Sequence, residues 1–491
     1  MEKGAGVLLP IFSLPSRYGI GTFGQEAYRF VKFIERSGLK YWQMLPLNPT
    51  SYGDSPYQSF SAFALNPYYI DLEELMKEGY LDKKDLKPLH HHYVRQVDYG
   101  EIYAKRFKIL EIAFHNSYDD YQEKIICFRK ANRKWVEDYA LFMVIKAMYS
   151  GISWTEWDEK YRLRKRNALD EIRIDQQEKI NFWIWIQYVA DKQYHRLRKY
   201  CHRHHVKIIG DMPIYVALDS ADVWANYGLF KLDKKRHPTE VAGVPPDYFS
   251  KTGQLWGNPL YNYEKMSRNG FSWWKQRVKK YSKFFDVLRI DHFRGMESYW
   301  AVDATAPTAE SGQWIEGPKM ELVNAINSAC GNMEIIAEDL GFLTQDVVDL
   351  KNKTGWPGLV IYQFAFDSHN VTDAYLPQNY VVNCVAYIGT HDNDTLKHFI
   401  STHIELHEYM KEILQVDSEE GIFEKMMETI SESVAQVVIY LMQDFLKEDG
   451  EFRFNTPGTA IGNWKYRLPR DYRLNASLEK YINNLVRLGK R

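Results

Sequence analysis

Net charge and long apolar runs are both scarce in this chain of 491 residues. Lys and Arg number 63 and Asp and Glu number 64, so the formal net charge is -1. That balance provides no long-range field to draw the chain toward nucleic acid or an anionic membrane surface. No run of about 18 uncharged apolar residues occurs, which argues against a membrane-spanning helix. We therefore expect neither nucleic acid nor membrane as a partner.

Cysteine is also scarce, and no C-x-x-C pair is present. The four cysteines are widely spaced along the chain: Cys127, Cys201, Cys330 and Cys384. This spacing argues against a disulfide scaffold and structural zinc, and favours a reducing compartment. Two histidine-rich stretches, 90–92 and 202–205, lack ligand spacing with Cys or carboxylate partners. The N-terminal residues show no secretory signal. The expectation is a cytoplasmic protein with no metal.

Apolar and aromatic residues are abundant. Hydrophobic residues make up 45% of the chain, enough for a substantial core, and this excludes a disordered or fibrous chain. Aromatic residues reach 15%, with 35 Tyr and 14 Trp. Aromatic faces pack against the flat apolar faces of sugar rings, but they also fill protein cores. The aromatic content is therefore only a hint toward a carbohydrate ligand.

Short apolar runs that alternate with helical patterns predict a parallel sheet. Helical periodicity is clear over 27–34, ending before Gly38, and over 182–197. The predicted strands lie within 8–12, 41–47, 206–216, 285–293, 334–341, 359–366 and 381–392, with a weak eighth near 453–459. This count favours a closed (β/α)₈ TIM barrel of the α/β class over an open doubly wound sheet.

Two stretches depart from the barrel rhythm. Residues from about 50 to 200 are mainly helical, with an apolar stripe over 136–148, and residues from about 217 to 275 are rich in Gly, Pro and aromatics. We interpret both as insertions in a single catalytic barrel that spans 1–491, the second supplying a lid over 247–259. A C-terminal helix over 478–486 is expected to close the outer ring.

Acidic residues stand at the ends of four predicted strands: Asp211, Asp291, Glu338 and Asp392. The active site of such a barrel lies where those strand ends meet. Carboxylates that close repel one another, so at least one of them should have a raised pKa. Retaining glycosidic chemistry requires such a set, a carboxylate nucleophile beside a carboxylic acid. Metal-assisted phosphoryl transfer would also use acids, but no G-x-x-x-x-G-K-[ST] loop is present.

The alternation in LRIDHF (288–293) suggests how two acids differ. Side chains alternate across a strand, so Arg289 and Asp291 face the same way. An inward-facing Arg289 would keep Asp291 ionised, as a nucleophile must be, while a more apolar pocket could keep Glu338 protonated.

The chain resembles glycoside hydrolase family 77 of the α-amylase clan, the 4-α-glucanotransferases also called amylomaltases or disproportionating enzymes. Matching strings span nearly the whole chain in the family's order: LPIFSLPSRYGIGTFG (9–24), YGDSPYQSFSAFALNP (52–67), GDMPIYVA (210–217), GVPPDYFSKTGQLWGNP (243–259), RIDHFRG (289–295), IAEDLG (336–341), GTHDNDT (389–395), NTPGT (455–459) and GNW (462–464). The resemblance implies Asp291 as nucleophile, Glu338 as general acid/base and Asp392 as transition-state stabiliser.

The resemblance also implies a set of substrate-binding residues: Ser55, Tyr57, Asp211, Asp247, Gln254, Trp256, Arg289, His391 and Asn463. The implied activity moves a segment of a 1,4-α-D-glucan to the 4-hydroxyl of an acceptor glucose or glucan by a retaining double displacement, in glycogen, starch or maltose metabolism. The implied partners are maltooligosaccharides, with no cofactor, and the chain would act as a monomer or homodimer. An α-glucan hydrolase of the same clan and a non-catalytic glucan-binding protein remain the alternatives.

Overall fold

Eight parallel strands form the centre of the molecule. The computed structural model describes residues 1–51, 53–90, 93–246, 250–341, 343–459, 461–472 and 476–491. The strands are β1 (Gly4–Leu8), β2 (Tyr41–Gln43), β3 (Lys207–Met212), β6 (Val287–Ile290), β9 (Glu334–Ala337), β10 (Gly358–Ile361), β11 (Cys384–Tyr387) and β12 (Val437–Leu441). Their order is β10-β11-β12-β1-β2-β3-β6-β9.

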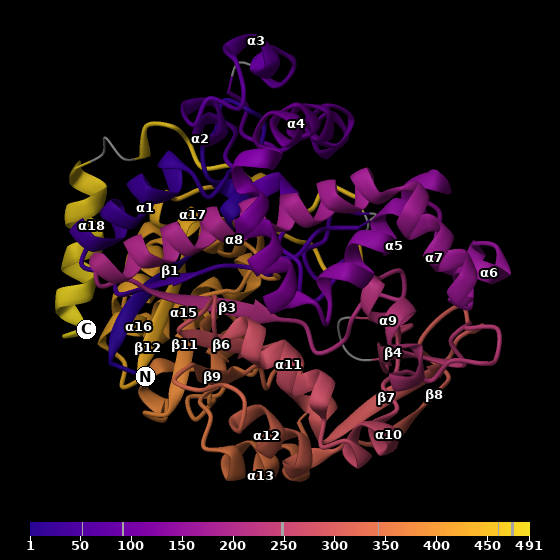
Figure 1. The fold of residues 1–491 in the computed structure, drawn as a ribbon. Helices are drawn as coiled ribbons and strands as arrows, with labels where there is room; N and C mark the ends of the chain where they lie inside the picture. Colours follow the sequence, from indigo (N-terminus) through magenta and orange to yellow (C-terminus); the bar gives the residue numbers. More distant parts are fainter. Residues whose placement is uncertain (52, 91–92, 247–249, 342, 460, 473–475) are drawn as a thin grey trace.

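The two ends of this sheet, β9 and β10, meet and close a barrel, which lies in the left half of the view in Figure 1. The backbone N–H of Ala337 on β9 donates to the carbonyl of Pro357, directly before β10, at 3.0 Å. The strands are almost wholly buried because helices cover them from outside. The predicted (β/α)₈ barrel is confirmed.

Two of the predicted strands are placed differently. The first strand covers Gly4–Leu8, not 8–12, because Pro10 has no N–H to donate and Ile11–Ser13 form a 3₁₀ turn. The eighth strand is β12, whose five residues VVIYL are all buried, and not 453–459. The latter stretch holds Pro457 and Gly458, with Gly458 in a positive-φ conformation, and contains no strand residue.

The predicted helices form. Helix α1 (Gln25–Arg36), α5 (Val136–Met148) and α8 (Gln177–Arg203) each bury a broad apolar face. Helix α18 (Ala476–Leu488) packs against α16 (Glu419–Glu432) and α1, on the outside of the barrel. The other helices that follow β3 are α9 (Ala221–Ala225), α10 (Tyr263–Arg268), α11 (Ser272–Tyr281), α12 (Lys319–Asn327), α13 (Gln345–Thr354), α14 (Leu396–Thr402), α15 (His407–Leu414) and α17 (Met442–Phe445).

Most of the chain between β2 and β3 is helical and lies at the top of the view in Figure 1. It comprises α2 (Leu72–Lys77), α3 (Lys83–Leu86), α4 (Tyr99–Asn132), α5, α6 (Glu159–Arg162), α7 (Arg166–Asp175) and α8. Helices α4 and α5 both pack on α8, which leads back into β3. The segment that follows Tyr57 packs on these helices: the Phe60 ring lies against Phe142 on α5, and the N–H of Leu65 donates to Gln187 on α8.

The stretch from about 217 to 275 contains more regular structure than predicted. Here β4 (Glu240–Val244) and β5 (Gln254–Pro259) join β7 (Ser298–Asp303) and β8 (Gly312–Glu316) in an antiparallel sheet of order β5-β4-β7-β8. The second half of the predicted lid is therefore strand β5. Strand β5 pairs with the nearby β4, but β4 pairs on its other side with β7, from a distant part of the sequence, and no local pattern shows that pairing.

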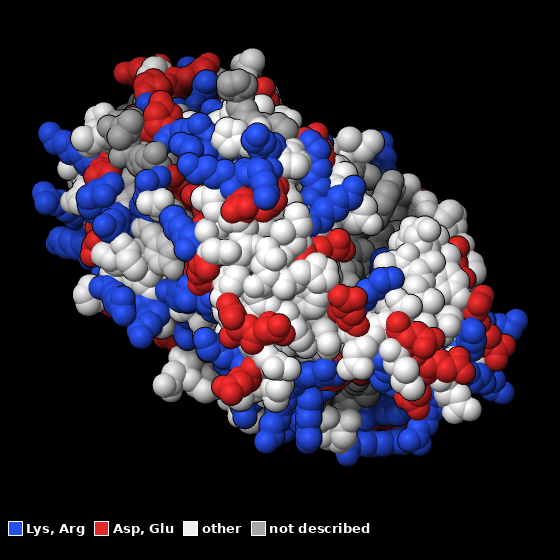
Figure 2. Space-filling model, turned by 45° about the horizontal axis from the view of Figure 1, so that its top comes forward, with Lys and Arg blue, Asp and Glu red and all other residues white. Residues whose placement is uncertain are grey.

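Positive and negative side chains alternate on the surface. Figure 2 shows Lys and Arg interspersed with Asp and Glu over the face drawn. Within the part of the chain that the structure describes, no helix is both long enough and apolar enough to cross a membrane.

Candidate active site

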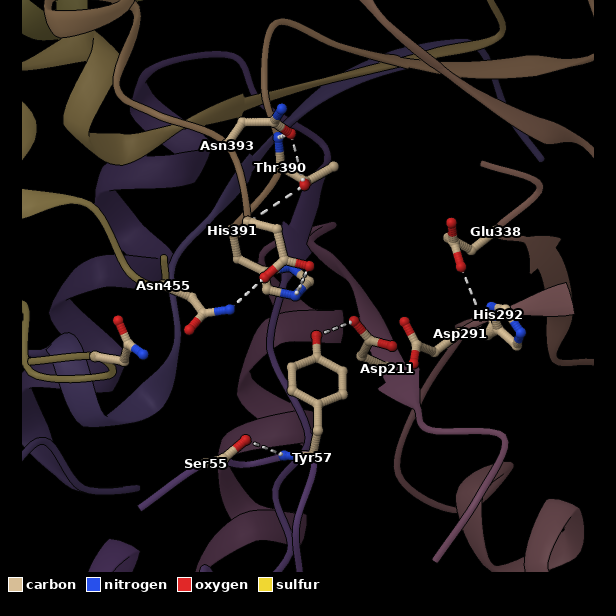
Figure 3. Close-up of polar contacts among 12 residues, drawn as sticks. Ser55, Tyr57, Asp211, Asp291, His292, Glu338, Thr390, His391, Asn393 and Asn455 are labelled. Carbon is tan, nitrogen blue, oxygen red and sulfur yellow. Dashed lines mark hydrogen bonds and ion pairs between the residues drawn. The ribbon is translucent and has the colours of Figure 1, made fainter. Parts of the chain in front are cut away.

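Three acids come from three neighbouring strands of the barrel. Asp211 lies within β3, Asp291 directly follows β6, and Glu338 directly follows β9. Because β3, β6 and β9 are consecutive in the sheet, their carboxyl groups meet at the same end of the barrel (Figure 3). Asp392 reaches this end from the loop after β11. The structure therefore brings together the four acids that the sequence pattern selected.

A buried arginine connects two of these acids. Arg289 on β6 is paired in register with Asp211 on β3, and its Nη1 lies 2.8 Å from both oxygens of that carboxylate. The same Nη1 lies 3.0 Å from Oδ1 of Asp291. The predicted inward alternation of Arg289 and Asp291 is therefore observed. A buried guanidinium offsets the repulsion between two close carboxylates.

Glu338 has a different environment. Its Oε2 accepts the backbone N–H of His292 at 2.5 Å, and its Oε1 accepts that of Leu340 at 3.2 Å. Desolvation by the surrounding protein raises the pKa of Glu338 to about 8, with a further upward contribution from Asp291, while Arg289 and the His292 N–H oppose the shift. Such a carboxyl group retains its proton at neutral pH.

The position of His292 contributes to this geometry. Its backbone is left-handed, with φ of 53°, which turns the N–H toward Glu338. Burial lowers the pKa of the His292 imidazole to about 4, so the ring is neutral at pH 7. A left-handed conformation is costly for a residue with a side chain, and such strain persists where the surroundings require it.

Two predicted sugar contacts close the side of the site opposite Glu338. The hydroxyl of Tyr57 donates to Oδ2 of Asp211 at 2.9 Å, and its ring stacks on the His391 imidazole with centroids 5.1 Å apart. Oγ of Ser55 accepts the N–H of Tyr57 at 3.2 Å and so shapes the turn that presents the ring. Figure 3 shows Tyr57 and His391 beside Asp211.

Asp392 has a partner that the sequence reasoning missed. Nδ2 of Asn455 donates to its Oδ1 at 2.7 Å, and Nε2 of His391 lies 3.3 Å from its Oδ2. The predicted Asn463 is used within its own loop, where Oδ1 accepts from Thr456 and Nδ2 donates to Thr459. Asn455 opens the NTPGT string, which offered a signal for it.

Gln254 and Trp256 come from the antiparallel sheet. The indole N–H of Trp256 donates to Oε1 of Gln254 at 3.2 Å, and its ring lies edge-on to His292 at 4.8 Å. Strand β5 therefore places Trp256 against His292, the residue that follows Asp291. The predicted Asp247 lies outside the described residues.

No group of three or more His, Cys, Asp or Glu side chains suited to a metal ion occurs among the residues described. The histidines in 202–205 are engaged separately: His202 pairs with Asp286 and His204 with Glu35. A cavity of about 410 Å³ beside Trp135, Asp222 and Trp273 is lined by none of the predicted site residues.

Comparison with known proteins agrees with this geometry. The sequence profile of the 4-alpha-glucanotransferase family of glycoside hydrolases, family 77, matches residues 9–473. A 4-alpha-glucanotransferase of Clostridium butyricum is 44% identical over 97% of this chain and 99% of its own length. One of Thermus thermophilus is 42% identical over 95% of both chains. The amylomaltase of Streptococcus agalactiae in complex with acarbose superposes with a TM-score of 0.96 at 38% identity, covering both chains completely. The chain belongs to glycoside hydrolase family 77, the 4-alpha-glucanotransferases.

Proposed function

We propose that this protein transfers a segment of a 1,4-α-D-glucan to the 4-hydroxyl of an acceptor glucose or glucan. The observation that carries the proposal is the contrast between two acids on adjacent strands: Asp291 is ion-paired with Arg289, and Glu338 has a raised pKa. A retaining glycosidase requires a carboxylate nucleophile and a protonated acid on either side of one anomeric centre.

The reaction then proceeds in two displacements. Glu338 protonates the glycosidic oxygen while a carboxylate oxygen of Asp291 attacks the anomeric carbon, so the bond to the leaving sugar breaks and a glycosyl ester forms. Glu338, now ionised, removes a proton from the acceptor hydroxyl, whose oxygen displaces Asp291. Because the anomeric carbon inverts twice, the product retains the α configuration.

The remaining site residues position the donor sugar. We assign Asp392 to the hydroxyls of the sugar ring at the cleavage point, where its contacts strengthen as the ring distorts. Asp211, Arg289, His391 and Tyr57 form the wall that receives this ring, and Ser55 shapes the turn of Tyr57. Trp256 and Gln254 would contact the neighbouring sugar, and Asp247 and Asn463 stay proposals from the family resemblance.

Transfer requires that a sugar hydroxyl reach the glycosyl ester before water does. Positioning of the acceptor against an aromatic surface raises its effective concentration, and a covered site excludes solvent. The indole of Trp256, held by Gln254 beside His292, supports such an acceptor surface. An α-glucan hydrolase would lack this preference, and a non-catalytic binding protein would not need the contrast between Asp291 and Glu338.

The context of the reaction follows from composition and chemistry. We infer a cytoplasmic protein in maltooligosaccharide, glycogen or starch metabolism, acting as a monomer or homodimer without a cofactor. The four cysteines are all free, as a reducing compartment allows. We also propose that the chain is one catalytic barrel, with the segments from about 50 to 200 and 217 to 275 as insertions.

One incubation distinguishes the candidate functions. The protein is mixed with maltotriose and the products are separated over time. Transfer yields glucose together with a ladder of longer oligomers, while the total number of reducing ends stays constant. Hydrolysis yields only shorter products and increases the reducing ends, and a binding protein leaves maltotriose unchanged. Either of these last two results would contradict the proposed function.

A further inference from the structure

Arg453 connects the two loops that carry Asp392 and Asn455. Its three donor nitrogens reach three different acceptors. Nη2 donates to the backbone carbonyl of Asp392 at 2.9 Å, Nη1 to Oδ2 of Asp394 at 3.2 Å, and Nε to the carbonyl of Asn455 at 2.9 Å. One guanidinium therefore holds the loop after β11 against the segment that follows β12.

The acceptors on the first loop are themselves fixed. Oδ1 of Asp394 accepts the N–H of Thr395 at 2.8 Å, and its carbonyl accepts from the buried Gln363 side chain at 2.9 Å. Asp394 thus gives Arg453 a rigid anchor at the mouth of the barrel. A planar fork of donors suits this task, since the ammonium group of lysine cannot reach several diverging acceptors at once.

The contact between the loop after β11 and the segment that carries Asn455 determines where the Asp392 carboxylate lies. That side chain is 46% exposed, so packing alone does not hold it. Its orientation depends on Nδ2 of Asn455 at 2.7 Å and Nε2 of His391 at 3.3 Å. Asn455 belongs to the opposite loop, and its backbone carbonyl is bound by Arg453. If the guanidinium is lost, the two loops can separate and Asn455 no longer meets Asp392 reliably.

We propose that Arg453 is a positioning residue that aligns Asp392 for the transition state by holding the loops 389–395 and 453–459 together. The inference rests on the proposed role of Asp392 in glucan transfer. Arg453 does not touch the sugar in this proposal. It acts through Asp392 and Asn455, and a displacement of about 1 Å at such a group can lower the rate about a hundredfold.

The test compares R453Q and R453K with R95Q in the full chain, using maltotriose and, for the weakest variants, α-maltosyl fluoride as donor. Arg95 is the control because it is similarly exposed, 33% against 24%, and also joins two segments, through Glu448 and the Arg467 carbonyl. It packs on Phe452, next to Arg453, so R95Q also reports any loosening of that segment which does not involve the Arg453 hydrogen bonds. Arg95 has no hydrogen bond to Asp392 among the contacts described. We expect R453Q to lose about 10- to 100-fold in kcat with a small change in KM, and R453K to lose less.

Three further measurements separate positioning from simple stability. Millimolar guanidinium chloride should restore part of the kcat of R453Q and none of any loss in R95Q. In a double-mutant cycle, R453Q should cost little once Asp392 is already Asn, because both changes remove the same function. Thermal unfolding should show R453Q folded at the assay temperature.

Three outcomes would overturn the inference: a kcat of R453Q within about twofold of the unaltered protein, an equal loss of kcat in R95Q, or additive effects in the cycle. Failure of the proposed function looks different. If the unaltered protein does not transfer glucan, the proposal for Asp392 falls and the inference for Arg453 falls with it.

Discussion

Arg289 lies between the carboxylates of Asp211 and Asp291. One of these ion pairs should matter mainly for the stability of the fold and the other mainly for catalysis. The Asp211–Arg289 pair is buried, with the Asp211 side chain 0% and the Arg289 side chain 4% exposed, whereas Asp291 is 29% exposed. Removal of one partner from a buried ion pair leaves an uncompensated charge. Loss of Asp291 leaves Arg289 still paired with Asp211, so the two acids should respond differently to substitution.

We predict that D291N folds normally and loses transfer activity. Its free energy of unfolding should stay within about 1 kcal/mol of the unaltered protein, while kcat falls at least about a thousandfold because no nucleophile remains. D211A is the matched comparison and should be destabilised by about 3–5 kcal/mol, since the guanidinium loses its main partner. Chemical denaturation and maltotriose assays give both quantities. Substantial turnover by D291N would require a different nucleophile.

Glu338 makes the rate depend on pH in a defined direction. Its pKa is raised to about 8, and the protonated form is the proton donor, so kcat/KM should fall as pH rises through that range. In E338Q this alkaline decline should disappear when the donor has a good leaving group such as fluoride, because departure then needs no proton. E338Q should also regain activity with that donor relative to maltotriose. A pH profile that is unchanged in E338Q would contradict the role of Glu338 as acid.

The same group should reduce the stability of the fold at neutral pH. Between the ordinary pKa of 4.5 and the raised value, the folded state holds a proton that the unfolded state has released, so the free energy of unfolding falls as pH rises. E338Q has no such loss. We expect it to exceed the unaltered protein by roughly 1–3 kcal/mol at pH 8 and to match it near pH 4. Denaturant titrations at both pH values test this, and a constant difference would contradict it.

At the scale of elements, the barrel strands were predictable because each is a short apolar run that ends in a polar residue. The exceptions have physical causes. The buried run VVIYL of β12 has no catalytic acid at its end, whereas 453–459 carries a polar motif but bends at Pro457 and Gly458. In the sheet β5-β4-β7-β8 the central pair, β4 with β7, joins strands more than 50 residues apart, which local periodicity does not reveal.

The same limit applies to the substrate-binding residues. Asp291 and Glu338 directly follow their strands and Asp211 lies near the end of β3, so the barrel topology determines their position. Asn455 and Asn463 lie in one irregular loop, and only the three-dimensional path shows that Asn455 faces Asp392.

Strand β3 gives a prediction about an element rather than a catalytic group. A Cβ on Gly210 would lie 2.3 Å from the Phe285 ring, and the next residue is Asp211. G210A should therefore displace β3, cost about 1–3 kcal/mol and lower kcat. G100A, in α4, is the control, because a Cβ there meets only Asp98 at 3.4 Å. Thermal unfolding and maltotriose assays compare the two. Equal free energies of unfolding for G210A and G100A would contradict this prediction, since they would mean that the Phe285 ring moves aside without loss of stability.

At the scale of the whole molecule, the near-zero net charge implies that substrate is not steered electrostatically. The chain carries a net charge of -1, and maltotriose is neutral, so neither attracts the other over long distances. The ion pairs that organise the site are buried or part-buried, where salt screens them weakly. Salt should therefore change neither the rate at which maltotriose encounters the site nor the ion pairs that act in the chemical step.

We therefore predict that kcat/KM for maltotriose is insensitive to ionic strength. It should vary by less than about twofold between roughly 0.05 and 0.5 M NaCl, because screening has no attraction to remove and does not reach the Arg289 pairs. Potassium chloride at the same concentrations controls for effects specific to one salt. A steep decline of kcat/KM in both salts would mean that exposed charges hold the substrate or the loops near Asp392. The Asp392 carboxylate is 46% exposed and pairs with His391, so salt can reach it. Repeating the titration with D392N would then assign the decline, since it should vanish in that variant only if this carboxylate is its source.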